Sequence, residues 1–229
     1  MTDTRTRIRR TVFPLAGLLL FAVLACGSTN PSVLRKLGEM SDWRDSVTID
    51  STRYAVPEQW HGLRLGLPGG PDPADLVDLP PELCAPGRKP RLRLEAFLSF
   101  RAMADMAAAD SIVLRVNSGY RSIETQRQLF RKRMAQGREF EEIAWSVAPP
   151  GYSEHMLGNT VDIALGGNYK DNPIYEWLLE NAFDYGFYET YPPDPSNVFP
   201  WEPWHWRYHT PAERRAREAR DEDAELNDN

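Results

Sequence analysis

The chain has 229 residues, of which 41% are hydrophobic, and its formal net charge is −6. This length supports one domain with a sizeable core and some appendages, and it leaves little room for a second full domain. The negative charge is concentrated in residues 221–229, which hold five acidic residues and no basic ones. Because no basic stripe runs along the rest of the chain, we expect no nucleic-acid partner.

The N-terminus has the pattern of an export signal. Four arginines in residues 5–10 precede an apolar run of 15 residues, 11–25, which is short for a membrane-spanning helix and typical of a signal-peptide core. The run ends in Val-Leu-Ala-Cys at Cys26, which resembles a bacterial lipobox. We therefore predict a signal peptide over 1–26, lipidation of Cys26 and a lipid-anchored protein in the bacterial cell envelope. The alternative is an ordinary secretory signal with an incidental cysteine.

The rest of the chain divides into a tether (27–45), a folded domain (46–210) and a charged acidic tail (211–229). Residues 46–56 alternate around a polar break and predict short strands. Residues 67–90 are rich in proline and glycine and predict a loop. If Cys26 carries lipid, Cys84 has no intrachain partner, so no disulfide framework is expected.

Helices and strands then follow in mixed order. Apolar spacing predicts a buried helix over 92–109, and 111–122 is predicted to be a strand that leads into a loop. Ser122 is placed to cap a helix that follows it, and Asn172-Pro173 starts another helix that ends at Gly186. A closing strand is predicted over 203–209. This order favours an α+β fold over a doubly wound sheet.

Three residues have the types and positions that a metal site requires. Residues 159–164 have strand character, so Asp162 faces away from its apolar neighbours and needs a partner. His205 alternates with tryptophans in the closing strand, and His155 lies seven residues before Asp162. Two His and one Asp can bind zinc with the fourth position open for water, and Glu202 would lie close enough to take a proton from that water.

Each of these residues taken alone is more often structural than functional: a lone histidine is commonly a satisfied or exposed side chain, and an aspartate can cap or form an ion pair. His61 lies in a loop outside the motifs. His209 is about 13 Å from His205 along an extended strand, too far to share one zinc ion. The combination of the three ligands with Glu202 therefore carries the prediction.

Four ordered segments resemble a known family: SGYRSIETQRQLF, PPGYSEHMLGNTVDI, WLLENAFDYGFYETYP and EPWHWRY. They are similar to the VanY-type D-alanyl-D-alanine carboxypeptidases, zinc peptidases of bacterial cell-wall metabolism, over roughly residues 90–208. The resemblance implies a small antiparallel sheet that bears the zinc ligands and packs against helices, the fold of hedgehog and D-Ala-D-Ala peptidases. It also implies one Zn²⁺ per chain, held by His155, Asp162 and His205, with Glu202 as the catalytic base.

The same resemblance implies the substrate and the residues that contact it. The substrate is a peptidoglycan stem peptide that ends in D-Ala-D-Ala, and the contacts fall on Tyr120, Arg121, Gln126 and Ser153. Arg121 either stabilises the tetrahedral intermediate or clamps the terminal carboxylate, and the sequence leaves this choice open. We expect a carboxypeptidase. The alternatives are an endopeptidase with the same zinc site and a non-catalytic, zinc-containing lipoprotein that binds wall peptide, although Glu202 favours an enzyme.

Overall fold

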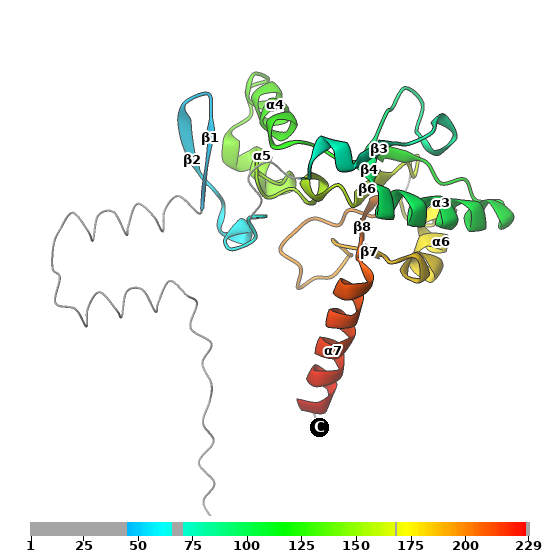
Figure 1. Ribbon diagram of the computed structural model, residues 1–229. Coiled ribbons are helices and arrows are strands. Elements are labelled where there is room, and N and C mark those ends of the chain that lie inside the picture. Colours follow the sequence, from blue (N-terminus) through cyan, green and yellow to red (C-terminus); the bar gives the residue numbers. More distant parts are fainter. Residues whose placement is uncertain (1–44, 66–70, 168, 228–229) are drawn as a thin grey trace, which may run out of the picture.

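The computed structural model describes residues 45–65, 71–167 and 169–227 (Figure 1). Cys26, the predicted signal peptide and nearly all of the predicted tether lie outside the described residues. Among the described residues, no helix is both long enough and apolar enough to cross a membrane.

The centre of the fold is a four-stranded antiparallel sheet in the order β5-β6-β8-β7. Its strands are β5 (Val116–Ser118), β6 (Thr160–Ile163), β7 (Phe187–Glu189) and β8 (His205–Tyr208). β6 and β8 are the strands expected over 159–164 and 203–209, whereas the short β7 was not predicted. The sheet and the helices around it confirm the α+β prediction.

Two helices cover one face of this sheet, α3 (Leu94–Ala109) and α6 (Pro173–Asn181), and both were predicted. The Asn172 side chain caps α6 by accepting hydrogen bonds from two backbone N–H groups of the first turn. A 3-10 turn, η5 (Ala182–Tyr185), continues α6 to Gly186, where the predicted stop occurs. The main core lies between these helices and the sheet, and it includes Ala96, Phe100, Met103, Val116, Val161, Ile163, Leu178, Phe187, Trp206 and Tyr208.

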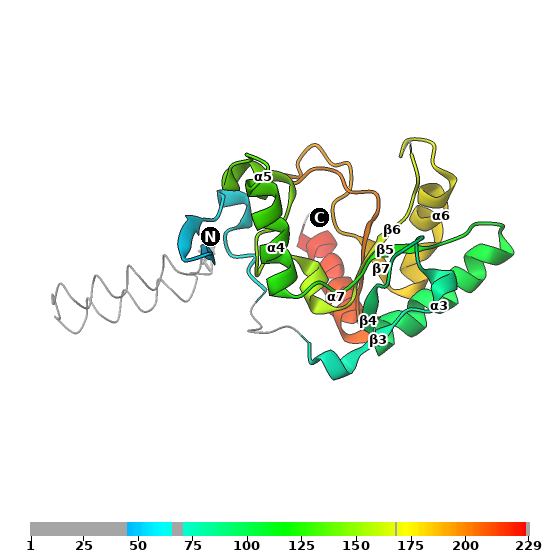
Figure 2. The same cartoon turned by 90° about the horizontal axis from the view of Figure 1, so that it is seen from above.

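Another pair of helices lies on the other side of the strands from α3 and α6, as Figures 1 and 2 both show. α4 (Ile123–Met134) begins where the sequence predicted, because Ser122 Oγ accepts a hydrogen bond from the Thr125 N–H. α5 (Phe140–Ser146) was not predicted. These helices share a second core with the N-terminal hairpin: Val47, Ile49, Val56, Trp60, Phe130, Phe140, Ile143, Ala144 and Tyr152.

The N-terminal hairpin consists of β1 (Ser46–Ile49) and β2 (Thr52–Ala55), which are the short strands expected in 46–56. Asp50 and Ser51 form its turn, and both have positive φ, as tight two-residue hairpin turns require. This hairpin contributes one wall of the second core.

The proline-rich stretch 67–90 is only partly the loop that was predicted. It contains a short strand, β3 (Leu76–Asp78), which pairs antiparallel with β4 (Arg91–Arg93), and two 3-10 turns, η2 (Pro73–Asp75) and η3 (Pro81–Leu83). The strand forms because its backbone meets that of β4 and buries Leu76, a contact that local composition does not show.

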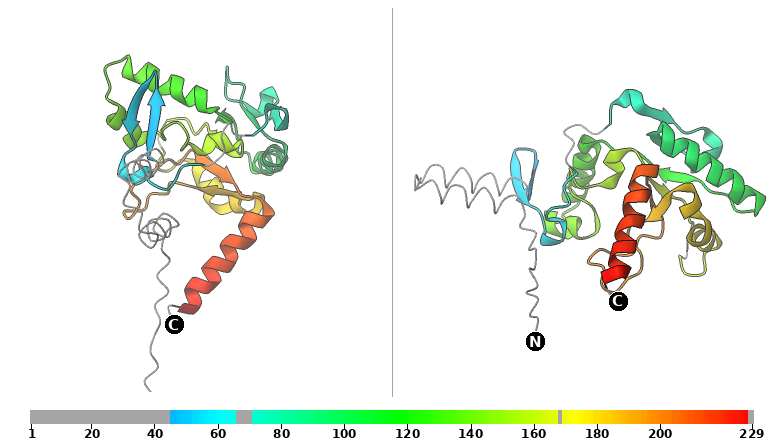
Figure 3. Two further views of the ribbon diagram at one scale, coloured as in Figure 1. Left: turned by 60° about the vertical axis from the view of Figure 1, so that its left-hand side comes forward. Right: turned by 60° about the horizontal axis from the view of Figure 1, so that its bottom comes forward.

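The predicted acidic tail is largely helical. α7 (Pro211–Asn227) follows β8 and leads away from the body of the molecule (Figure 3, left). At its first turn, Glu213 accepts a hydrogen bond from the Thr210 N–H and pairs with Arg207.

Candidate metal centre and active site

Asp162 and His205 are direct cross-strand neighbours. The register of β6 and β8 places Asp162 opposite His205, so both side chains leave the same face of the sheet. Their strand neighbours Val161 and Trp206 point into the core on the opposite face. The alternation predicted from the sequence is therefore confirmed, and the register brings the two polar residues together.

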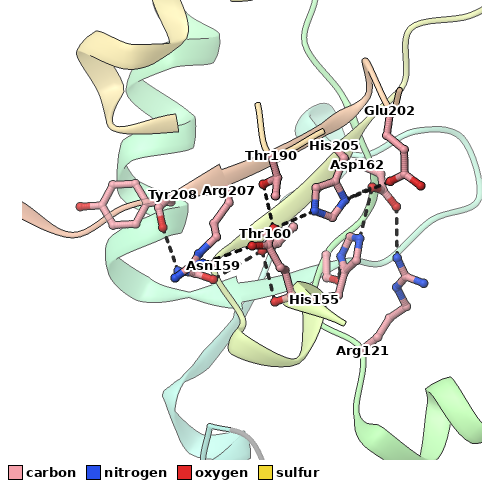
Figure 4. A network of polar contacts seen from close by, with 12 residues as sticks. Arg121, His155, Asn159, Thr160, Asp162, Thr190, Glu202, His205, Arg207 and Tyr208 are labelled. Atoms are coloured by element: carbon pink, nitrogen blue, oxygen red, sulfur yellow. Dashed lines mark hydrogen bonds and ion pairs between the residues drawn. The ribbon is translucent and has the colours of Figure 1, made fainter. Parts of the chain in front are cut away.

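His155 reaches the same point from a different element. It lies on η4 (Glu154–Leu157), a 3-10 turn and not a strand. The turn ends at Gly158, whose φ of 76° lies in the left-handed region. A Cβ there would also lie 3.0 Å from Leu76 Cδ2. Glycine is therefore favoured at this reversal for two reasons: it adopts a positive φ without strain, and it has no side chain to collide with Leu76. The reversal into β6 directs His155 onto Asp162 (Figure 4).

The three side chains converge on a single point. Asp162 Oδ1 lies 3.2 Å from His155 Nε2 and 3.2 Å from His205 Nδ1, and the three ligand atoms all lie within 4.8 Å of one another. A tetrahedral site with metal–ligand bonds of about 2.0 Å has ligand–ligand edges of about 3.3 Å. The spacing of these atoms thus fits a small tetrahedral cation.

The protonation of His155 supports a cation at this point. Its Nδ1 lies 2.8 Å from the carbonyl oxygen of Gly119, and its Nε2 faces the Asp162 carboxylate. Burial lowers the pKa of His155, so the ring is neutral and carries one N–H. One proton cannot satisfy two oxygen acceptors. With Nδ1–H donating to Gly119, the Nε2 lone pair faces the carboxylate, and a metal ion between them removes the repulsion.

Gly119 can hold its carbonyl oxygen beside His155 because there is no room for a side chain at this position. A Cβ at Gly119 would lie 2.6 Å from the carbonyl oxygen of Arg91. A side chain would push the 119 carbonyl away from His155, so the glycine of the SGYR segment sets the position of the acceptor that orients a metal ligand.

Glu154 plays the corresponding role for His205, a role that was not predicted from the sequence. His205 Nε2 donates to Glu154 Oε2 at 3.0 Å, and the same carboxylate accepts from Thr190 Oγ1 at 2.8 Å and from Arg207 Nη1 at 3.1 Å. Burial raises the pKa of Glu154, but these donors, led by His205, lower it to about 2. Glu154 adjoins His155 in the sequence and orients the other histidine, 51 residues away, so no local signal identifies it.

The carboxylates of Asp162 and Glu154 favour a positive charge at the metal cluster. Burial lowers the pKa of His205, but its hydrogen bonds to Asp162 and Glu154 outweigh burial and raise the pKa to about 9. Burial likewise raises the pKa of Asp162, but the two neighbouring histidines, of which His205 carries the positive charge, hold it well below its usual range. The cluster therefore holds two ionised acids, which a divalent cation neutralises more fully than a proton.

Glu202 stands at the edge of the cluster, where the sequence placed the base. Its Oε2 lies 3.7 Å from His205 Nδ1. Its backbone is held by two hydrogen bonds, since the Glu202 N–H donates to the Tyr191 carbonyl and the Glu202 carbonyl accepts from the His205 N–H. Burial raises the pKa of Glu202. A carboxylate of raised pKa beside a metal site is suited to accept a proton.

Arg121 lies beside the same ligands and is fixed by them. Its Nη2 is 3.4 Å from Asp162 Oδ2 and its Nη1 is 3.4 Å from Gln126 Oε1. Gln126 is itself buried and donates to the Ala148 carbonyl at 2.7 Å. Burial lowers the pKa of Arg121, but guanidinium stays charged at neutral pH. The structure thus brings Arg121 and Gln126 to the metal cluster.

The cluster opens into a pocket of about 230 Å³. Of the other residues predicted to contact substrate, Ser153 lines this pocket, whereas Tyr120 does not and instead lies under the Arg91 guanidinium. His61 and His209 lie away from the cluster, as expected. The lining residues are Trp60, Arg121, Gln126, Leu129, Arg133, Trp145, Ser146, Val147, Ala148, Ser153, Glu154, His155, Asp162, Tyr191, Phe199, Pro200, Glu202, Trp204 and His205.

Comparison with known proteins relates this arrangement to a family. The chain is 34% identical over 173 residues to a D-alanyl-D-alanine carboxypeptidase of Enterococcus faecalis, an alignment that covers 70% of this chain and 63% of that protein. It is 35% identical over 96 residues to a D-alanyl-D-alanine carboxypeptidase of Enterococcus faecium, covering 41% of this chain and 29% of that protein. The chain thus spans less than two thirds of the length of either relative.

Among solved structures, the fold is similar to the LdcB LD-carboxypeptidase, whose structure is described as revealing the molecular basis of peptidoglycan recognition. The TM-score is 0.58 at 28% identity, and the likeness covers 79% of this chain and 90% of that one. Residues 89–211, more than half of the chain, match the VanY family, described as D-alanyl-D-alanine carboxypeptidase. The chain therefore belongs to the VanY family.

Proposed function

We propose that this protein is a zinc-dependent D-alanyl-D-alanine carboxypeptidase that removes the terminal D-Ala from peptidoglycan stem peptides. The observation that carries the proposal is the position of Glu202, a partly buried carboxylate 3.7 Å from His205 Nδ1 at the edge of a His-Asp-His cluster that lines a pocket. A protein that only bound wall peptide would have no use for an acid of raised pKa at this point.

Zinc is the ion that the donor set fits best. Two imidazoles and one carboxylate form the three-ligand set of catalytic zinc sites, which keep a fourth position for water. Harder ions such as magnesium prefer an all-oxygen set, and softer ones prefer thiolate. Each histidine also donates its other ring nitrogen to a fixed acceptor, Gly119 or Glu154, as zinc-binding histidines do.

The residues of the pocket can then carry out peptide hydrolysis. Zinc held by His155, Asp162 and His205 would lower the pKa of a water bound there to roughly 7. Glu202 is placed to accept a proton from a water that attacks the peptide carbonyl and to return that proton to the leaving amine. Arg121, held beside Asp162, offers N–H donors to the oxygen on which negative charge develops.

The substrate class rests on family membership and on the relatives' names, both D-alanyl-D-alanine carboxypeptidases. A second candidate is an L,D-carboxypeptidase, which removes a D-residue that follows an L-residue. The likeness to LdcB, an LD-carboxypeptidase, over 90% of that chain favours this candidate.

We also propose that the protein is exported and anchored by lipid on Cys26 at the periplasmic or outer side of the membrane. The arginine-rich start and the apolar run that ends in a lipobox-like cysteine support this location. A membrane-anchored enzyme would meet wall peptides outside the cytoplasm.

Mass spectrometry of the reaction products tests the proposed activity. The purified, zinc-loaded protein is incubated with a stem pentapeptide that ends in D-Ala-D-Ala, a tetrapeptide that ends in an L-residue followed by D-Ala, and cross-linked muropeptides. Glu202→Gln is the test variant. Glu142→Gln, an exposed acid on α5 that pairs with Arg138, is the matched control.

Loss of one D-Ala from the pentapeptide by the wild type and the control, but not by Glu202→Gln, is the expected result. Cleavage of the tetrapeptide alone would instead establish the L,D-carboxypeptidase. Cleavage of cross-links alone would make the protein an endopeptidase. No cleavage with one zinc bound per chain would overturn the proposal in favour of a binding protein.

A further inference from the structure

Arg133 lines the pocket and has no acidic partner in the part of the chain that the structure describes. Among the described residues, its guanidinium has neither an ion pair nor a side-chain hydrogen bond. The other arginines of α4 differ, since Arg127 pairs with Glu124 and Arg131 pairs with both Glu124 and Asp50. Of the three arginines of α4, Arg133 alone lines the pocket, and its charge is the one that can bind a ligand.

Helix geometry sets the separation of Arg133 from Gln126, the residue of α4 that contacts Arg121. Arg133 follows Gln126 by seven residues, close to two full turns, so both residues lie on the same face of α4, about 10 Å apart along its axis. Gln126 contacts Arg121, which contacts Asp162. The pocket thus runs from the metal cluster, past Gln126, to Arg133.

The surroundings divide the pocket into two ends of different character. At the inner end, Arg121 is neutralised by Asp162. At the other end, Leu129 lies one turn before Arg133 on α4, and both line the pocket together with Trp145, which is 59% exposed. An exposed indole and an unpaired guanidinium form a partly apolar, cationic surface, which suits the backbone and carboxylate of a peptide.

We propose that Arg133 is the centre of an anion subsite that binds a carboxylate of the substrate two to three residues upstream of the cleaved bond. The subsite rests on the proposed function. An extended peptide rises about 3.3 Å per residue, so the axial separation of about 10 Å between Gln126, which contacts Arg121 beside the metal cluster, and Arg133 corresponds to three residues. The third residue upstream of the terminal bond in a wall stem peptide is D-glutamate, which is linked through its γ-carboxyl and presents a free or amidated α-carboxyl.

Matched peptides test this subsite. One pentapeptide carries a free α-carboxyl on D-glutamate and its partner carries the amide, both with lysine as the third residue. A second pair has diaminopimelate as the third residue with its own carboxyl free or amidated, which distinguishes the two sources of carboxylate. The variants are Arg133→Gln and the control Lys132→Gln, which removes the same charge from the exposed neighbouring position.

For the wild type and Lys132→Gln, kcat/KM is expected to be about tenfold higher for the peptide with the free D-glutamate carboxyl than for the amide. The difference should lie mainly in KM. A factor of about ten is what one charge-assisted hydrogen bond contributes to binding. Arg133→Gln is expected to lose this preference. An equal loss on both peptides, or the same loss in Lys132→Gln, would overturn the subsite, as would a preference that follows only the diaminopimelate carboxyl.

Binding measurements keep this test separate from the proposed activity. Zinc-loaded Glu202→Gln and the Glu202→Gln/Arg133→Gln double variant are titrated with the same peptides by calorimetry. A tenfold preference for the free carboxyl in the first protein, absent in the second, supports the subsite even if no peptide is cleaved. No preference in either protein would overturn it even if the wild type proves to be a carboxypeptidase.

Discussion

The Nε2–H of His205 donates to Glu154 Oε2 at 3.0 Å. Because the pKa of Glu154 is lowered to about 2, this carboxylate is ionised and can only accept, so the proton belongs to His205 Nε2. The contact turns the Nδ1 of the same ring toward Asp162 Oδ1, 3.2 Å away. One hydrogen bond therefore keeps a proton on Nε2 and sets the orientation of this proposed metal ligand.

Removing the Glu154 carboxylate is expected to weaken zinc binding. Glu154→Ala should lower zinc affinity by about 10- to 100-fold, because His205 loses the acceptor that orients it, and Glu154→Gln should lose less because its amide oxygen still accepts. Competition with a chromogenic chelator measures the affinity. Glu213→Gln, which removes the other acid that pairs with Arg207, is the control and should retain wild-type affinity. An equal loss in Glu154→Ala and Glu213→Gln would contradict the role of Glu154.

Zinc is expected to stabilise the fold through the three proposed ligands. At a free zinc concentration of 100 times Kd, binding to the native state alone adds about 2.7 kcal/mol to the free energy of unfolding. Differential scanning calorimetry with and without zinc should show a higher Tm for the wild type and no increase for His155→Ala. His209→Ala, which removes a histidine that packs on Tyr188 away from the cluster, should keep the increase. A zinc response that survives in His155→Ala would place the metal elsewhere.

Arg121 is expected to act on the chemical step. Its Nη2 is held 3.4 Å from Asp162 Oδ2, beside the place where the carbonyl oxygen gains charge. Arg121→Gln should therefore lower kcat by about 10²- to 10³-fold and change KM little. The comparison uses a pentapeptide with a free C-terminus and one with a C-terminal amide. If the wild type rejects the amide and Arg121→Gln no longer distinguishes the two, Arg121 instead clamps the terminal carboxylate.

Glu189 is expected to give the unfolding free energy a pH dependence. Burial raises its pKa above the ordinary 4.5, although N–H and O–H donors from Trp201 and Tyr175 oppose this. A raised pKa in the folded state means that the native protein binds the proton more tightly than the unfolded chain does. The stability contributed by Glu189 is therefore fully present below pH 4.5 and is lost as the pH rises through the raised value.

Urea unfolding of the wild type and Glu189→Gln over pH 4 to 7 measures this effect, because other titrating groups cancel in the difference between the two proteins. Relative to the variant, the wild type should gain stability as the pH falls through the interval just above 4.5. A difference that is independent of pH would show that Glu189 has the same pKa in the folded and unfolded chains.

Local patterns predicted much of the fold because their causes are local. Ser122 and Asn172 cap α4 and α6 through bonds within a few residues, and both caps form as expected. β3 lies within a stretch predicted as loop, because its pairing partner, β4, lies 13 residues or more away along the chain. The short helix α5 and the strand β7 were missed for a similar reason: their stability comes mainly from packing against other elements.

Within the site, the identity of the residues was predictable and their arrangement was not. The alternation of β6 and β8 placed Asp162 and His205 on polar faces, but the register that sets them opposite each other depends on strand pairing. Tyr120, a contact implied by the family motif, lies outside the pocket. Arg133, which no motif singled out, lines it because of the way α4 packs with α5 and the N-terminal hairpin in the second core.

The sequence by itself determined the chemistry of this protein: two histidines, an aspartate and a glutamate at the spacing of a hydrolytic metal site. The side-chain types are given by the sequence, and the alternation along each strand follows from the order of its polar and apolar residues. The tertiary structure alone decided that Glu154 orients His205, that Gly119 orients His155 and that Arg133 lines the pocket with no acidic partner among the described residues. Hydrogen bonds and charge pairs act over about 3 to 4 Å, so these roles arise only when packing brings distant segments together.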